Sequence, residues 1–412
     1  MATSSEIHKA TTRVAQDDWG RLLAALISTL RDFQLAEDCL QEAFASALDH
    51  WARGIPENPQ GWLLQTARRK AIDRIRRQKN LNTKLPDLAL LMEMDREDSA
   101  AEQAQEIPDE RLRLIFTACH PSLDQKTQVA LTLRTLCGLT TTEIASAFLD
   151  KEPAMAQRLV RARQKITKAG IPFVVPEPDA WTERLNSVLT VIYLIFNEGY
   201  SSLNVSEAAA DLVEEALRLA NLLDYLQPDE EEVQGLIALM QLTYARAAAQ
   251  NSEMGALVPL EEQDRALWDH QKAAIARTNL EAVLRRGRPG PFQLQAAIAA
   301  IHSEAERFED TGWHEIVLIY DRLIEITPNP VLRLNQAVAI SYDQGAEFAL
   351  RIVEPLNEAL DEYQSYHAVR ADLCRRLNKP KQAIASYQRA IQMSRNESDK
   401  RFLSQKLSQI KK

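Results

Sequence analysis

Apolar residues recur three and four positions apart along most of this 412-residue chain, which is the spacing of one buried face of an α-helix. Helices are expected over residues 17–78, with a break at 54–59, and over 109–169 and 181–412. Only 12 glycines are present, and Ala, Leu, Glu, Gln and Arg, which favour helices, are abundant. We therefore predict an all-α protein.

Two segments interrupt the helical pattern and predict the domain organisation. Residues 80–108 contain Pro86, Pro108 and an acidic run over a weak apolar pattern, which indicates a linker. Residues 170–178 contain three prolines, which forbid a continuous helix, so we place a domain boundary there. The predicted parts are a domain over 1–79, the linker 80–108, a domain over 109–170, a helical extension over 171–290 and a repeat domain over 291–412.

The last part of the chain repeats itself. A shift of 67 residues aligns Thr311–Asn329 with Asn378–Asn396 and places Tyr320 on Tyr387, and half that shift places Ile316 on Ala349. A period of about 34 residues made of paired helices is typical of tetratricopeptide repeats. Such repeats stack into a curved surface that binds protein segments, so we expect a protein partner for residues 291–412.

Charge is distributed unevenly along the chain, although the formal net charge is −9. Residues 51–80 hold eight Lys and Arg against two Asp and Glu, whereas residues 201–240 hold nine acidic residues against one Arg. This asymmetry suggests a front part that binds nucleic acid and a back part with a different task.

The most basic segment, residues 59–77, combines apolar and cationic residues on one predicted helix. Trp62, Leu63, Ala67 and Ile72 recur at helical spacing. The cationic residues are Arg68, Arg69, Lys70, Arg74, Arg76 and Arg77. An aromatic ring beside such a face suits phosphate neutralisation combined with base stacking. The plain alternative is a solvated basic face on an ordinary helix.

Residues 127–168 follow a helix-turn-helix pattern. Gly138 ends the first helix, Thr140 or Thr141 caps the second with Glu143 in its first turn, and Pro153 suits the first turn of the third. The third helix leaves Gln157, Arg158, Arg161, Arg163, Lys165 and Lys168 on its outer surface. This arrangement lets a recognition helix enter the DNA major groove, although an ordinary three-helix unit has the same pattern.

Taken together, these residues resemble the extracytoplasmic-function (ECF) sigma factors of bacterial RNA polymerase. Residues 32–51 are similar to the region 2 helix that contacts the β′ clamp helices, which implies a contact set of Glu37, Asp38, Gln41, Glu42 and Phe44. Residues 59–77 are similar to the part that opens and reads the −10 element, which implies Trp62, Arg68, Arg69, Arg74, Arg76 and Arg77 as its DNA-binding residues.

Residues 109–168 resemble sigma region 4, which reads the −35 element. The matching landmarks are Gly138–Thr140, Glu143–Ala145 and Arg158–Arg163. The resemblance implies DNA contacts by Gln157, Arg158, Arg161, Arg163 and Lys165. Lys151 and Pro153 depart from the family pattern, so the −35 sequence cannot be read from family rules.

The remainder resembles the ECF subgroup that carries a tetratricopeptide extension, with Asn197–Tyr200 and the repeats as its landmarks. The implied partners are core RNA polymerase, through its β′ clamp helices and β flap, and promoter DNA. The linker 80–108 is then expected near the RNA exit path.

Other function classes are disfavoured by what the sequence lacks. Cys39, Cys119, Cys137 and Cys374 have no metal-ligand spacing, so no metal and no cofactor are expected. No phosphate loop or nucleophile elbow accompanies His120 or Asn197–Tyr200, the unusual polar clusters, so we expect no enzyme. No segment approaches the ~20 apolar residues that span a bilayer, and no signal peptide is apparent, which predicts a cytoplasmic protein without a membrane partner.

We therefore predict a promoter-specificity factor with a fused C-terminal regulatory domain, whose acidic stretch is placed to cover the basic faces. Two alternatives remain open from the sequence. A helix-turn-helix regulator that is not a polymerase subunit would bind duplex DNA specifically by itself. A tetratricopeptide adaptor, whose basic helices dock acidic partners, would fail to co-purify with polymerase.

Overall fold

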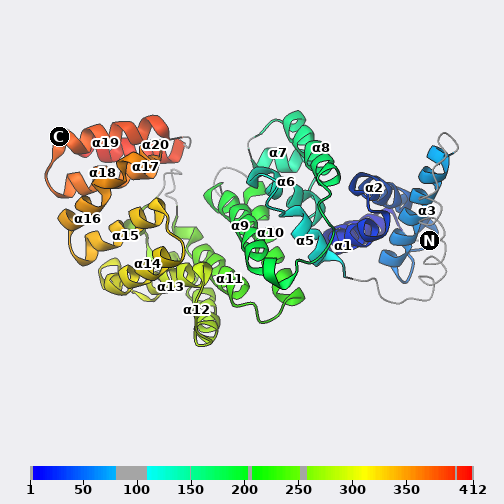
Figure 1. Cartoon of the computed structure of the whole chain (residues 1–412), viewed down its shortest axis with the longest axis horizontal. Helices are drawn as coiled ribbons and strands as arrows, with labels where there is room; N and C mark the ends of the chain where they lie inside the picture. Colours follow the sequence, from blue (N-terminus) through cyan, green and yellow to red (C-terminus); the bar gives the residue numbers. More distant parts are fainter. Residues whose placement is uncertain are drawn as a thin grey trace. The chain divides into compact units, whose positions relative to one another are not determined.

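The computed structural model describes residues 3–79, 109–148, 150–202, 207–250, 258–394 and 397–410. Within these ranges the chain forms helices and short connections without a strand, which confirms the predicted all-α fold (Figure 1). The predicted linker 80–108 lies outside the described residues. The chain divides into two compact units, residues 1–216 and 217–412, and each is described by itself.

The first unit begins with a helical bundle of α1 (Ser4–Leu30), α2 (Phe33–His50), the 3-10 turn η1 (Trp51–Arg53) and α3 (Pro59–Lys79), in which the three α-helices contact one another. Asp32 caps α2 by accepting a hydrogen bond from the backbone N–H of Leu35. Helix α1 starts at Ser4 rather than near residue 17, because Ile7 and Val14 extend its buried stripe toward the N-terminus.

The second part of this unit contains the helix-turn-helix: α5 (Arg111–Ala118), α6 (Gln125–Thr135), α7 (Thr141–Ala147) and α8 (Glu152–Lys168). Thr140 and Glu143 cap α7 reciprocally, since each backbone N–H donates to the other residue's side chain, at 2.7 and 3.2 Å. Gly138 ends the preceding turn at φ +73°, and a Cβ there would lie 3.0 Å from the ring of Trp19 on α1. The predicted inward stripe of α8 is buried: Met155, Leu159, Ala162 and Ile166.

Helix α9 (Pro178–Ser202) extends this unit beyond the proline-rich segment. It packs on α5 and α6, where the rings of Trp181 and Phe116 lie 5.2 Å apart. Residues 170–178 do break the helix, but the division between the two compact units falls after Ala216, within α10 (Glu207–Leu226). Helix α9 belongs to the first unit because it covers the apolar side of α5.

The second unit begins after α10's midpoint and contains a scaffold followed by repeats. The scaffold elements are α11 (Glu231–Tyr244), η2 (Ala247–Ala249), η3 (Leu260–Glu262), η4 (Arg265–Leu267), α12 (His270–Leu284), α13 (Pro291–Glu304) and η5 (Phe308–Asp310). The repeat elements are α14 (Trp313–Ile326), α15 (Pro330–Asp343), α16 (Ala346–Val353), η6 (Glu354–Leu356), α17 (Asn357–Leu360), α18 (Gln364–Arg376), α19 (Pro380–Met393) and α20 (Glu397–Ile410).

The helix starts of this second group confirm the predicted repeat. The main helices begin at residues 313, 330, 346, 364, 380 and 397, so alternate helices start 33 or 34 residues apart. Equivalent positions Ile316, Ala349 and Ala383 are all buried in one core, as the alignment of the sequence with itself requires. Figure 1 shows these helices following one another from α14 (yellow) to α20 (red), and each main helix contacts the next.

Candidate nucleic-acid interface

The outer face of α8 forms a shallow groove with the start of α6. Gln157, Arg158, Arg161 and Lys165 line it, which brings together four of the five residues predicted to read the −35 element. Lys126, from the first turn of α6, lines the same groove and was missed by the sequence analysis. In the sequence, a lysine two positions after the capping residue Asp124 is only a weak signal, and the fold alone brings it close to α8.

Hydrogen bonds hold the side chains of this groove in place. Arg158 forms a salt bridge with Asp150 at 3.1 Å, and Lys165 donates to the backbone carbonyl of Ser122. Asp124 accepts hydrogen bonds from Thr127, which lower the pKa of its carboxyl. Arg161 is exposed, so its guanidinium is accessible to a ligand in the groove. The surface is cationic and ordered, as binding to a phosphate backbone requires.

Arg163, the fifth predicted residue, lies on the other side of α8 and binds Glu37 of α2. Its guanidinium donates to Glu37 and, at 2.8 Å, to Gln34. Arg134 of α6 also donates to Glu37, at 2.6 Å from Nε to Oε1. The Glu37 side chain is 5% exposed and the two arginines are 13% exposed. We call Glu37, Arg134 and Arg163 the Glu37 clasp.

The clasp joins two residues that the sequence assigned to different partners. Glu37 was predicted to contact polymerase and Arg163 to contact DNA, yet in this structure they form one buried ion pair. Burial lowers the pKa of Arg163, and the carboxylate of Glu37 opposes that effect by stabilising the charged guanidinium. Both assignments stay predictions, and both require the clasp to open.

The other predicted polymerase contacts on α2 are partly engaged with α3. Arg74 donates to Asp38 at 3.2 Å and to Glu42, and Lys70 lies 3.6 Å from Glu42. Phe44 packs against the ring of Trp19, with centroids 5.9 Å apart. Gln41 is exposed, while Asp38 and Glu42 remain partly accessible. The Arg74 side chain therefore connects α3 to α2 in this structure.

The predicted −10 residues of α3 are distributed over two environments. Arg69, Arg76 and Arg77 are exposed. Arg68 is buried, with 9% of the residue exposed, because it lies on the side of α3 that carries Ala67 and Ala71. Trp62 is half-buried and packs edge-on against Trp51, with centroids 5.7 Å apart. Charge counting in the sequence could not separate these cases, because it treats every cation as exposed.

Two thiols of the first unit, those of Cys39 and Cys119, are protected by burial. Desolvation raises the pKa of Cys39 to about 11 and that of Cys119 to about 12. Because the thiolate is the reactive form, native protein is expected to alkylate slowly at both positions even at pH 9, and quickly after denaturation. Peptide mass spectrometry after iodoacetamide treatment measures this. Equal labelling of Cys119 in native and denatured protein would contradict it.

In the described part of the chain, no group of three or more His, Cys, Asp or Glu residues is arranged to hold a metal ion. None of the helices in those ranges is both long and apolar enough to cross a bilayer.

Comparison with protein families assigns the two N-terminal helical parts. Residues 18–81 match Sigma-70 region 2, and residues 113–166 match Sigma-70, region 4. Residues 184–284 match a family of unknown function, DUF6596. The bundle of α1–α3 and the helix-turn-helix are thus the two conserved regions of a sigma factor, in the same order along the chain.

Individual relatives agree with this class. The chain is 30% identical over 141 residues to the ECF RNA polymerase sigma factor SigM of Bacillus subtilis, covering 34% of this chain and 83% of SigM. It is 32% identical to the probable RNA polymerase sigma factor RfaY of Xanthomonas campestris over 37% of this chain and 40% of RfaY. The chain therefore belongs to the ECF RNA polymerase sigma factor family, and it is a sigma factor.

Two further matches extend over nearly the whole chain. An uncharacterized protein of Rhizobium meliloti, R00370, is 43% identical over 393 residues, covering 94% of this chain and 93% of its own length. The crystal structure of the P58(IPK) TPR domain covers 90% of this chain and 98% of its own, at 13% identity and a TM-score of 0.26, which is too low to carry an argument.

Proposed function

We propose that the groove of α8 reads the −35 promoter element. The observation that carries this is the convergence of Gln157, Arg161 and Lys165 with Lys126 on one face of the helix-turn-helix. In this arrangement the cations bind phosphates and supply affinity, while Gln157, near the N-terminus of α8, hydrogen-bonds base edges and supplies sequence choice. Arg158 holds the end of the preceding turn through Asp150.

On α3, the exposed Arg69, Arg76 and Arg77 contact the phosphates of the melted −10 strand. Trp62 assists strand separation from the start of the same helix, supported from behind by Trp51. Arg74, bonded to Asp38 and Glu42, serves this face by fixing α3 on α2.

The contact with core polymerase is assigned to the exposed side of α2, with Gln41, Asp38 and Glu42 facing the β′ clamp helices and region 4 meeting the β flap. The partial exposure of these side chains supports this. Such a factor acts in the cytoplasm, where core polymerase works, and catalyses no reaction itself. Affinity purification of the tagged full-length chain tests the proposal: core subunits are expected in stoichiometric amount, and their absence would overturn it.

The second compact unit, residues 217–412, is proposed to regulate the sigma regions. Its separation from residues 1–216 and the five acidic residues that it contributes to the stretch 201–240 support this. The packing of α9 determines where the chain can be truncated to test this role. A chain that ends at residue 174 would lack α9 and would expose Phe116, which is fully buried. A chain that ends at Ala216 retains α9.

Removing residues 217–412 is expected to change promoter transcription severalfold, because the acidic unit no longer competes with DNA for the basic faces at high effective concentration. The measurement is run-off transcription with core polymerase, using chain 1–216 after circular dichroism has verified its helices. Identical transcription by the truncated and full-length proteins would contradict a regulatory role.

A further inference from the structure

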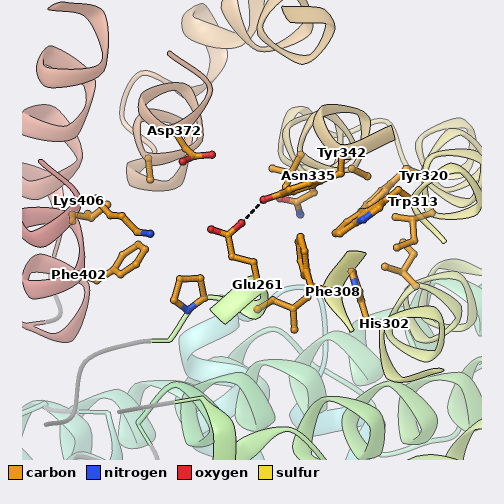
Figure 2. A pocket seen from close by; sticks show the side chains of 18 of the residues that line it. Glu261, His302, Phe308, Trp313, Tyr320, Asn335, Tyr342, Asp372, Phe402 and Lys406 are labelled. Carbon is orange, nitrogen blue, oxygen red and sulfur yellow. Dashed lines mark hydrogen bonds between the residues drawn. The ribbon is translucent and has the colours of Figure 1, made fainter. Parts of the chain in front are cut away.

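The second compact unit contains a cavity of about 370 Å³ among its repeat helices (Figure 2). Its walls come from α13, α14, α15, α18, α19 and α20, and from the segment 259–261. A volume of ~300–1,000 Å³ with a mainly apolar lining and a few polar groups is usual for small-molecule sites. The cavity is remote in sequence from both sigma regions and has no role in promoter recognition as proposed above.

One wall is a short segment, residues 258–263, which we call the strap. Its two glutamates bind opposite sides of the repeat surface: Tyr342 Oη donates to Glu261 Oε2 at 2.8 Å, and Lys406 Nζ donates to Glu262 Oε1 at 2.6 Å. Directly after the strap, buried Arg265 donates to the carbonyls of His302 and Ala305 at 2.8 and 2.6 Å. The strap is therefore fixed to the unit, and the cavity is a built site.

The side of the cavity opposite Lys406 is aromatic. The rings of Trp313 and Tyr342 are stacked with centroids 4.6 Å apart, and Phe308 meets both edge-on at 5.1 and 5.0 Å. His302 packs edge-on against Trp313, and burial lowers its pKa to about 3, so its ring is neutral. Rings that support one another in this way offer a rigid apolar surface to an aromatic guest.

The charged groups of the lining favour a donor-bearing ligand. They are two carboxylates, Glu261 and Asp372, and one ammonium, Lys406, which is bonded to Glu262 of the strap. Asp372 is balanced by Arg375 at 2.6 Å. Glu261 accepts a hydrogen bond from the Tyr342 hydroxyl but forms no salt bridge with any residue in the described ranges. A carboxylate accepts about four hydrogen bonds, so its remaining capacity suits a cationic donor.

We propose that this cavity binds a small organic cation: an amine carried on an aromatic or polycyclic body. The ammonium group donates to Glu261, and the apolar body lies against the ring cluster of Phe308, Trp313 and Tyr342. The strap supplies the charged anchor and the repeat helices supply the apolar walls. The proposed ligand of the second unit is thus an organic cation. This assignment does not depend on whether the ligand changes the sigma activity.

Three naphthalene probes that differ only in their polar group test the proposal on the full-length chain by isothermal titration calorimetry. 1-Naphthylmethylamine is expected to bind at least tenfold more tightly than 1-naphthylmethanol, and 1-naphthylacetate is expected to bind most weakly. Equal or tighter binding of the acetate would overturn the assignment of a cation, and binding of none of the probes would overturn the site.

Two variants locate the binding. Glu261→Gln keeps the hydrogen-bond acceptor but removes the charge, so the amine should fall to the affinity of the alcohol while the alcohol is unchanged. Glu358→Gln, which changes an exposed glutamate of α17 away from the cavity, is the matched control and should leave all affinities unchanged. Ala368→Phe fills the cavity and should weaken all three probes in a protein whose helices are retained. An amine preference that persists in Glu261→Gln would contradict the proposal.

Discussion

Glu37→Ala is expected to destabilise the packing of the two sigma regions by about 3–5 kcal/mol, because removing one partner of a buried ion pair leaves the other charges uncompensated. In this chain two guanidinium groups, those of Arg134 and Arg163, would lose their shared carboxylate while remaining largely excluded from water. The change is expected in local stability, since the clasp connects α2 with α6 and α8.

Hydrogen exchange of the full-length protein measures this effect segment by segment. Because 1.4 kcal/mol corresponds to a factor of ten, protection of amides in α2, α6 and α8 should fall by roughly 100- to 4,000-fold in Glu37→Ala. Asp49→Ala, an exposed substitution at the C-terminal end of the same helix, is the control and should change stability by less than ~0.5 kcal/mol. Equal protection in the two variants would show that the clasp does not hold the regions together.

The double variant Arg161→Ala, Lys165→Ala is expected to weaken promoter binding by the complex of this chain with core polymerase. Each lost phosphate contact should reduce the slope of log affinity against log salt concentration by about one. It should also lower the affinity for all DNA sequences by the same factor. Gln157→Ala should instead cost about 1–3 kcal/mol and relax sequence choice at one −35 position.

The two effects are separated by measuring promoter affinity over a range of salt with wild-type and single-base-pair −35 variants. Lys272→Ala removes an exposed charge from α12 in the second unit and serves as the control. An unchanged salt slope in the double variant, or an unchanged base preference in Gln157→Ala, would contradict the proposal that the α8 groove reads the −35 element.

Local structure in this protein could be predicted because it follows from short-range chemistry. The capping pair Thr140 and Glu143, the proline at the start of α8 and that helix's buried stripe are all set by residues within a few positions of one another. The repeats were predictable for a similar reason: each helix pair packs on the next, so the same positions become buried every 33 or 34 residues.

The long-range pairings could not be predicted from the sequence. Glu37 and Arg163 are 126 positions apart, and each alone resembles an exposed residue on an amphipathic helix. The burial of Arg68 depends on how α3 packs within its bundle, and the contact of α9 with α5 depends on rings that no local pattern connects. The strap reaches Tyr342 and Lys406 across 81 and 144 residues.

In the proposed function, this chain directs core RNA polymerase to specific promoters through α3 and α8. In vitro transcription of fragmented genomic DNA tests it most directly, with core polymerase alone, with the full-length chain, and with Arg161→Ala, Lys165→Ala. We expect discrete start sites only when the full-length chain is added, and we expect the double variant to lose them. Specific duplex binding by the chain alone, without any polymerase-dependent start sites, would contradict it.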